Sequence, residues 1–230
     1  MWMGQYDLKG LLGLFIQSVF VQNILLFNFL GMCSYLACSN KMKTANGLGI
    51  AVTLVITVGG VLNWGVHNFV TGAGALSWAG LAGVNLSFLE LIIFISVIAG
   101  FVQVLEIAIE KFSPPLYAAL GVYLPLITVN CAILGACLFA TVREYAFFPN
   151  LIYLFGAGLG WWLAIVLMAA IREKLAYSNI PHGLRGMGIA FIMTGLIAMT
   201  FMALTGINLD VSGKKPPVPM ILNSGTEQNP

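Results

Sequence analysis

Charged residues are scarce in this sequence. Only 8% of its 230 residues are charged and 60% are hydrophobic, whereas about a quarter of the residues of a typical soluble domain are charged. A soluble globular domain is therefore excluded. The net charge of +2 is too small for a protein that binds nucleic acid through its phosphates, so this class is excluded as well.

Histidine and cysteine are also few. Neither of the two histidines has a second histidine or a carboxylate at metal-ligand spacing. None of the four cysteines, Cys33, Cys38, Cys131 and Cys137, belongs to a CxxC pair, which excludes a zinc ribbon, a ferredoxin-type cysteine run and a thioredoxin-like redox motif. The sequence also lacks a P-loop, a catalytic triad and an NADH-binding domain. We therefore expect no catalytic residues in this chain.

Long apolar segments make up most of the chain. Six of them are long enough to cross a bilayer, and they cover residues 11–38, 48–70, 86–109, 116–141, 150–171 and 184–207. The first has no small-residue cleavage site of the kind found in signal peptides, so we expect it to be retained. The sequence thus predicts an all-α integral membrane protein, with a single transmembrane domain over residues 1–209 and a flexible tail over residues 210–230.

Basic residues are shared unevenly between the two sides of the membrane that six spans would create. One side, formed by the loops after the first, third and fifth spans, contains Lys41, Lys43, Lys111, Arg172, Lys174 and Arg185. The other side contains Lys9, Arg143, Lys214 and Lys215. Because cytoplasmic loops are enriched in lysine and arginine, we expect both termini on the outer side.

The first and fourth apolar segments are abnormal in the same way. As one straight helix, the 28 residues of segment 11–38 would measure about 42 Å, against about 30 Å for the hydrocarbon core. This segment contains Gly31, and the fourth contains Pro125 and Asn130. Proline removes one helix hydrogen bond, and Asn130 could satisfy the backbone group that is freed. We therefore expect both helices to be interrupted.

Two interrupted segments at positions one and four of six indicate an internal repeat. Two copies of three spans would enter the membrane from opposite sides, because three is an odd number. Such inverted repeats place their broken helices face to face near the bilayer midplane. Cys33 and Cys131 directly follow the two interruptions, so we expect them to meet at the pseudo-twofold axis.

The residues alone leave the role of these two cysteines open. Buried thiols often serve as simple apolar side chains, and a disulfide between Cys33 and Cys131 is a second possibility. As thiolates they could instead hold an iron–sulfur centre. Because such a centre usually takes four thiolates, a second membrane protein would then supply two. Cys38 and Cys137 are expected to be core or lipid-facing thiols.

Glu106 is an acidic residue inside the third apolar segment. It lies four residues before Glu110, so the two carboxylates share one helix face. Because a buried carboxylate is costly in a membrane, Glu106 either reaches interfacial water or lines an ion path.

Three glycines, Gly156, Gly158 and Gly160, alternate within the fifth apolar segment. The pattern is superficially that of a nucleotide-binding loop, but no strand–turn–helix pattern surrounds it. Close packing against another helix explains these glycines better.

Several short segments together point to one family. They are Phe29–Cys33, Gly47–Val52, Phe112–Tyr117, Leu124–Ile133, Ile171–Lys174 and Gly183–Gly188. Through them the chain resembles, from about Leu12 to Leu209, the E-type membrane subunits of Na+-translocating NADH:quinone reductases, which belong to the wider NqrDE/Rnf membrane subunit family.

The resemblance implies six transmembrane helices as two inverted three-helix repeats, with helices 1 and 4 interrupted. It also implies a 2Fe-2S cluster or other iron centre that is shared with an NqrD-like homologous subunit in the opposite orientation. Cys33 and Cys131 match the family's metal-ligating cysteines, whereas Cys38 and Cys137 do not. Glu106 matches an intramembrane acidic residue that is linked to sodium uptake. The loop 71–83 and the tail depart from the family pattern.

The function implied by the resemblance is electron transfer within a sodium-pumping NADH:quinone oxidoreductase. The chain would carry electrons across the bacterial inner membrane together with the A, B, C and F components of the Nqr complex, with NAD and flavins in other subunits only. Sodium ions and membrane lipid would be its other contacts. The alternative is a small inverted-repeat secondary transporter without a redox centre, since broken helices are also typical of that class.

Overall fold

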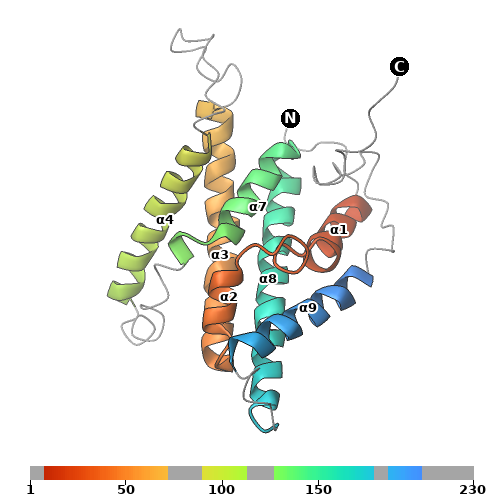
Figure 1. Ribbon diagram of the computed structural model, residues 1–230. Coiled ribbons are helices and arrows are strands. Elements are labelled where there is room, and N and C mark those ends of the chain that lie inside the picture. The colour runs from red at the N-terminus through yellow and green to blue at the C-terminus, as the bar shows by residue number, and fades with distance from the viewer. Residues whose placement is uncertain (1–7, 72–89, 113–126, 179–185, 204–230) are drawn as a thin grey trace, which may run out of the picture.

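The computed structural model describes residues 8–71, 90–112, 127–178 and 186–203, and this part of the chain contains helices but no strand. Two short elements, η1 and η2, are π-helices. The elements in chain order are α1 (Leu8–Ile16), η1 (Gln17–Val21), α2 (Met32–Cys38), α3 (Met42–Val66), η2 (His67–Thr71), α4 (Glu90–Phe112), α7 (Cys131–Val142), α8 (Phe147–Leu175) and α9 (Met187–Ala203) (Figure 1). The predicted all-α class is confirmed.

Three helical segments are long and apolar enough to cross a membrane. They are Met42–Phe69, Leu91–Ala108 and Phe147–Leu175, and they coincide with the second, third and fifth predicted spans. Shorter apolar helices occupy parts of the other three predicted spans. The chain is therefore a helical membrane protein, and the count of six spans stays a prediction. The predicted tail 210–230 lies outside the described residues, as does most of the loop 71–83.

The first predicted interruption is present. η1 is followed by turns over residues 22–31, and α2 begins at Met32. The buried Asn23 side chain accepts a hydrogen bond from the backbone N–H of Leu25 at 3.0 Å and donates one to the carbonyl of Gly160 at 2.8 Å. An asparagine that bonds its own backbone two residues on favours a turn over a helix, so Asn23 explains the interruption after η1.

The fourth predicted segment is also interrupted. α7 begins at Cys131, and Asn130 directly before it has an extended backbone with φ −73° and ψ 115°. The Asn130 side chain accepts a hydrogen bond from the backbone N–H of Ala132 at 3.0 Å, as a helix N-cap does. Asn130 thus satisfies the N–H of Ala132 at the start of α7. Pro125 lies outside the described residues, so the expected bond to the backbone group that it frees stays a prediction.

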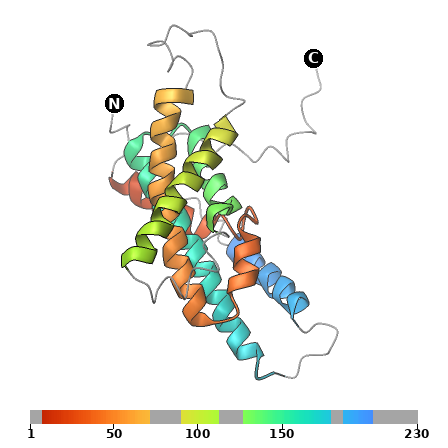
Figure 2. The ribbon, with the colours of Figure 1, turned by 90° about the vertical axis from the view of Figure 1, so that its left-hand side faces the viewer.

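The two long helices α3 and α8 run antiparallel through the centre of the molecule (Figure 1). α4 lies against α3, whereas α1 and α9 lie against α8 (Figures 1 and 2). α2 and α7 both begin near the middle of the long pair and extend to opposite ends, α2 toward the start of α3 and α7 toward the start of α8. Both breaks therefore lie halfway along the molecule.

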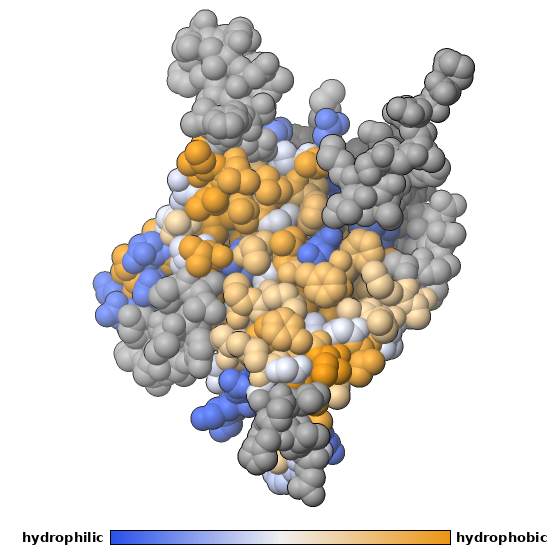
Figure 3. Space-filling model, in the orientation of Figure 1, coloured by the Kyte–Doolittle hydropathy of each residue, from blue (hydrophilic) through white to orange (hydrophobic). Residues whose placement is uncertain are grey.

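Most of the described basic residues lie at one end of the helix bundle. They are Lys41 and Lys43 at the start of α3, Lys111 at the end of α4, and Arg172 and Lys174 in the last turn of α8. Between the two ends the surface is mainly apolar (Figure 3). The described ends of these loops thus lie at one end of the molecule, which agrees with the predicted grouping, while the six-span topology stays a prediction.

Glycines let α8 approach its neighbours closely. A Cβ atom added to Gly158 would lie 2.9 Å from the backbone Cα of Thr53 in α3. Gly156 and Gly160 face η1 instead, and a Cβ atom added to Gly160 would lie 2.8 Å from the carbonyl oxygen of Val19. The prediction that this alternating stripe serves close helix packing is confirmed.

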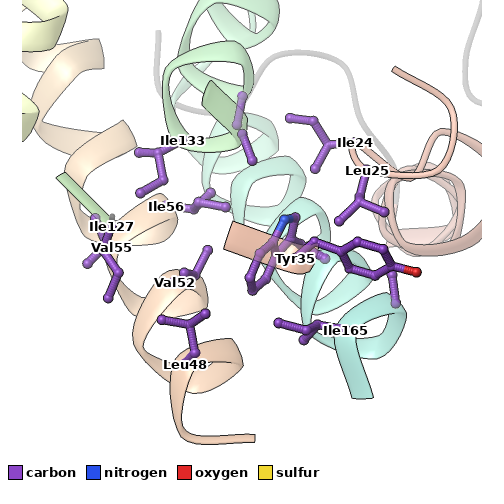
Figure 4. Close-up of a cluster of buried hydrophobic side chains, with 14 of the residues drawn as sticks. Ile24, Leu25, Tyr35, Leu48, Val52, Val55, Ile56, Ile127, Ile133 and Ile165 are labelled. Carbon is purple, nitrogen blue, oxygen red and sulfur yellow. The ribbon is translucent and has the colours of Figure 1, made fainter. Parts of the chain in front are cut away.

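The hydrophobic core surrounds the breaks. Figure 4 shows buried side chains from the first break, α2, α3, α7 and α8, among them Ile24, Leu25, Tyr35, Leu48, Val52, Ile56, Ile133 and Ile165. Non-helical backbone at membrane depth is tolerated only where protein or a polar cavity covers it. This core supplies much of that cover.

The Gly158 contact leads to a stability prediction. Gly158→Ala is expected to destabilise the protein by about 1–3 kcal/mol, because the added methyl group meets backbone that cannot move aside. The matched control is Gly100→Ala in α4, where an added Cβ atom meets nothing within 4 Å. Alanine is the better helix former, so the control should be neutral or slightly stabilising. Thermal unfolding in detergent, followed by circular dichroism, measures both, and equal effects would contradict the packing interpretation.

Candidate metal site at the two helix breaks

The four cysteines divide into two kinds. Cys33 is the second residue of α2 and Cys131 the first residue of α7, and both side chains are exposed. Cys38 and Cys137 are buried, with 1% and 2% of their surface exposed. All four thiols are free. Cys38 and Cys137 are thus core thiols, within the range of the sequence prediction, and of the four only Cys33 and Cys131 are open to a group outside this chain.

A hydrogen bond joins the two breaks. The backbone N–H of Gly31 donates to the Sγ atom of Cys131 over 2.9 Å, although the two residues are 100 positions apart. Gly31 is the N-cap of α2, so Cys33 follows only two residues after this contact. This bond brings the backbone just before Cys33 to the sulfur of Cys131, while the meeting of the two cysteines at a pseudo-twofold axis stays a prediction.

Both conformation and space require glycine at position 31. The φ angle of Gly31 is +84°, in the left-handed region where glycine is favoured. A Cβ atom added there would lie 2.6 Å from the indole Nε1 of Trp161 and 2.9 Å from the Cβ of Ala132. Without a side chain in this gap, the Gly31 backbone comes close enough to α7 to bond the sulfur.

Two buried polar side chains join the breaks a second time. The Asn130 Nδ2 donates to the Ser34 Oγ over 3.1 Å, and the Ser34 hydroxyl donates to the carbonyl of Gly31 over 3.1 Å. Ser34 and Asn130 are 0% and 2% exposed. Ser34 is a site residue that sequence patterns miss, since its only signal is its place directly after Cys33 and one turn after Gly31.

Arginines fix the outer parts of the two interrupted segments. Arg172 of α8 donates to the carbonyl of Leu36 near the end of α2 over 3.2 Å. Arg143, directly after α7, donates to the Oε1 of Gln22 at the start of the first break over 2.7 Å. The guanidinium of Arg143 also lies over the ring of Tyr153, 5.2 Å from its centroid. The first interrupted segment is therefore tied twice to parts of the chain that are distant in sequence, α2 to α8 and the start of the first break to the end of α7.

The surface beside the two thiols is apolar. Phe29, four residues before Cys33, is 53% exposed, and Val129, two residues before Cys131, is 76% exposed. A large exposed apolar side chain thus lies within four residues of each exposed cysteine. In a membrane protein such a surface faces lipid or another apolar chain.

The donor set fits half of an iron–sulfur site. Thiolates are the soft ligands that iron–sulfur clusters take, usually four to a cluster. Within the described part of the chain, no group of three or more His, Cys, Asp or Glu side chains could hold a metal ion. Cys33 and Cys131 would therefore supply two ligands, and the other two would have to come from another chain.

Glu106 lies away from the breaks in sequence, near the end of α4. Its side chain is half-buried, and that of Glu110, one turn further on the same helix face, is exposed. Lys111 follows at the basic end of the molecule. Glu106 thus lies one turn deeper than the exposed end of α4. This depth suits a carboxylate that reaches interfacial water and also one that lines an ion path.

A family model matches most of the chain. The family is described as "Rnf-Nqr subunit, membrane protein", and the match covers residues 11–208. All the elements described above except the first residues of α1 lie within that range.

Named relatives are similar over nearly the whole length. The E component of the Na(+)-translocating NADH-quinone reductase of Chlamydia muridarum is 59% identical over 231 residues, which covers 100% of this chain and 93% of the relative. The protein of the same name from Chlamydia caviae is 60% identical, over 97% of this chain and 86% of the relative. That of Hahella chejuensis is 57% identical, over 86% of this chain and 98% of the relative.

Proposed function

The chain belongs to the Rnf-Nqr family of membrane subunits, and from this premise we propose how it serves a Na+-translocating NADH-quinone reductase. It is the E-type membrane subunit of that oxidoreductase, which the identity of 57–60% to relatives of this name supports. As a subunit it takes part in the enzyme without containing the whole reaction. Its role is to hold a redox centre inside the membrane and so to carry electrons across the bilayer.

Cys33 and Cys131 are the proposed ligands of this centre, a 2Fe-2S cluster or another iron centre. The single observation that carries the proposal is the hydrogen bond from the Gly31 N–H to the Cys131 Sγ, because it joins two helix breaks that each lead into an exposed cysteine. When bound, such a centre would accept and pass on one electron at a time.

The chain's own residues prepare this position for a negatively charged group. The Gly31 N–H points at a sulfur, which stabilises negative charge on the thiolate. Ser34 and Asn130, each adjacent in sequence to one of the two cysteines, are buried. The exposed Phe29 and Val129 would provide an apolar rim that keeps water away once a partner covers it. Tight cover by protein also lowers the local dielectric, which strengthens each of these interactions.

The proposed partner is a homologous NqrD-like subunit that inserts in the opposite orientation and contributes two further cysteines. The A, B, C and F components complete the complex, with NAD and flavins in other subunits only. Two inverted three-helix repeats over residues 1–209 are proposed for this chain, followed by a flexible tail. The opposite directions of α2 and α7 support the inverted repeat.

A multi-pass position in the bacterial inner membrane, with both termini periplasmic, is the proposed topology. The five basic residues at one end of the molecule (Figure 1) support a cytoplasmic position for that end. The names of the relatives favour this electron-transfer role over the alternative of a secondary transporter.

Substitution of the exposed cysteines tests the metal site. Cys33→Ala or Cys131→Ala in the assembled complex should remove the intramembrane iron signal and most quinone-reductase turnover, because three thiolates hold the centre poorly. Iron content and electron paramagnetic resonance measure the first effect. Cys38→Ala and Cys137→Ala are the matched controls and should keep the iron. Full turnover with Cys131→Ala would end the ligand proposal.

Reporter fusions test the topology. A periplasmic reporter fused after Leu209 should be active, whereas one inserted between Lys41 and Lys43 should be inactive, because an even number of spans returns the chain to its starting side. Activity of alkaline phosphatase fusions measures this directly. Reversed activities would show that the basic end faces the periplasm and would overturn the proposed orientation.

Glu106 is the proposed ion-path residue, and sodium titration tests it. Glu106→Gln keeps shape and polarity but removes the negative charge that attracts a cation. The sodium concentration for half-maximal turnover should therefore rise several-fold, while the iron content stays unchanged. Glu110→Gln, at the exposed position one turn away, is the control and should leave the titration in place. An unchanged titration in Glu106→Gln would leave this carboxylate as an interfacial residue.

A further inference from the structure

We propose that Ser34 and Asn130 form a positioning pair that sets the reduction potential of the centre held by Cys33 and Cys131. The inference rests on the proposed function, because it concerns the same two thiols. Neither Ser34 nor Asn130 is a ligand. Each acts through the backbone next to a cysteine.

Four hydrogen bonds form a circuit through both breaks. The Gly31 N–H donates to the Cys131 Sγ at 2.9 Å, and the Gly31 carbonyl accepts from the Ser34 hydroxyl at 3.1 Å. The Ser34 Oγ accepts from the Asn130 Nδ2 at 3.1 Å. The Asn130 Oδ1 accepts from the N–H of Ala132, the residue after Cys131, at 3.0 Å. The series of bonds thus begins at Cys131 and ends at the residue that follows it.

The half-helix that contains Cys33 depends on this circuit. α2 has only seven residues, and its N-cap Gly31 has no side chain to bond the free N–H groups of the first turn. A helix of this length is unstable by itself. The bond from Asn130 to Ser34 joins the first turn of α2 to the residue before α7, and Cys33 lies in that turn.

The circuit also helps to fix the backbone conformation of Gly31, because it bonds both the N–H and the carbonyl of this residue. The Gly31 carbonyl accepts from the Ser34 hydroxyl and from the backbone N–H of Tyr35, both at 3.1 Å. Together these bonds hold Gly31 in the conformation that lets its N–H meet the Cys131 sulfur. An N–H donor at a ligand sulfur stabilises the added negative charge of the reduced centre and therefore raises its reduction potential. Loss of the pair should loosen this bond and lower the potential.

Two substitutions each remove the Ser34–Asn130 hydrogen bond, one by changing the acceptor and the other by changing the donor. Ser34→Ala deletes the hydroxyl and leaves the buried Asn130 Nδ2 without its partner. Asn130→Ser keeps a side chain that can cap α7 but is too short to reach Ser34. In the assembled complex both variants should keep the iron, since both cysteines remain, and both should lower the midpoint potential of the centre and change its paramagnetic resonance spectrum. The double variant should shift the potential no further than the larger single shift, because the two residues act as one unit.

Ser39 provides the matched control on the same short helix. It is the C-cap of α2, fully buried like Ser34, and its Oγ has no hydrogen-bond partner within the described residues. Ser39→Ala is therefore the same chemical change at the same burial, but outside the circuit. It should leave the midpoint potential and the spectrum unchanged.

The outcomes separate this inference from the proposed function. If Ser34→Ala and Asn130→Ser both keep the parent potential while Cys131→Ala loses the iron, the positioning role is overturned and the ligand role stands. A shift in Ser39→Ala equal to that in Ser34→Ala would also overturn it, because any change in α2 would then have the same effect. Should Ser34→Ala fail to assemble, Asn130→Ser decides by itself. If Cys131→Ala keeps the iron centre, both proposals fail together.

Discussion

A helix that breaks inside a membrane must find partners for its freed backbone groups, and the whole arrangement of this molecule follows from that constraint. Two asparagines meet it in similar ways. Asn23 accepts from the N–H of Leu25, and Asn130 accepts from the N–H of Ala132. In both cases the carboxamide NH2 group then donates to another helix, from Asn23 to Gly160 of α8 and from Asn130 to Ser34 of α2. The cost of breaking a helix in lipid is thus offset by contacts that bind the breaks to the rest of the fold.

The close packing of α8 makes these contacts possible. Gly160 has no side chain, so the Asn23 Nδ2 reaches its carbonyl at 2.8 Å, in the space that a Cβ atom would occupy. Two residues earlier, Gly158 lets α3 approach α8 at Thr53. The alternating glycines of α8 therefore serve two contacts on different faces of the helix: Gly158 packs against α3, and Gly160 receives the first break. A larger residue at position 160 would disturb the contact with the first break, because a Cβ atom there meets the Val19 carbonyl and the Asn23 Nδ2.

The sequence predicts the membrane class and both interruptions, because they depend on local properties of the chain. The sequence alone shows the length of the apolar segments and the helix-breaking residues. It also shows that Cys33 and Cys131 follow the breaks. It does not show the partners of the breaks. Ser34 looks like any small polar residue beside a cysteine, and its bond to Asn130 spans 96 positions. The contact between Gly31 and Cys131 likewise depends on a left-handed φ angle that glycine permits but does not dictate.

The contrast between the two pairs of cysteines indicates that a second chain contacts this one. Cys38 and Cys137 are sealed in the core, whereas Cys33 and Cys131 are exposed beside Phe29 and Val129. Packing for stability alone would bury all four thiols, since free cysteine behaves as a small apolar side chain. Two exposed thiols beside helix breaks that are held in place instead suit a metal site whose remaining ligands come from another chain. The ordering of this junction by so many contacts is therefore best explained if a second chain completes it.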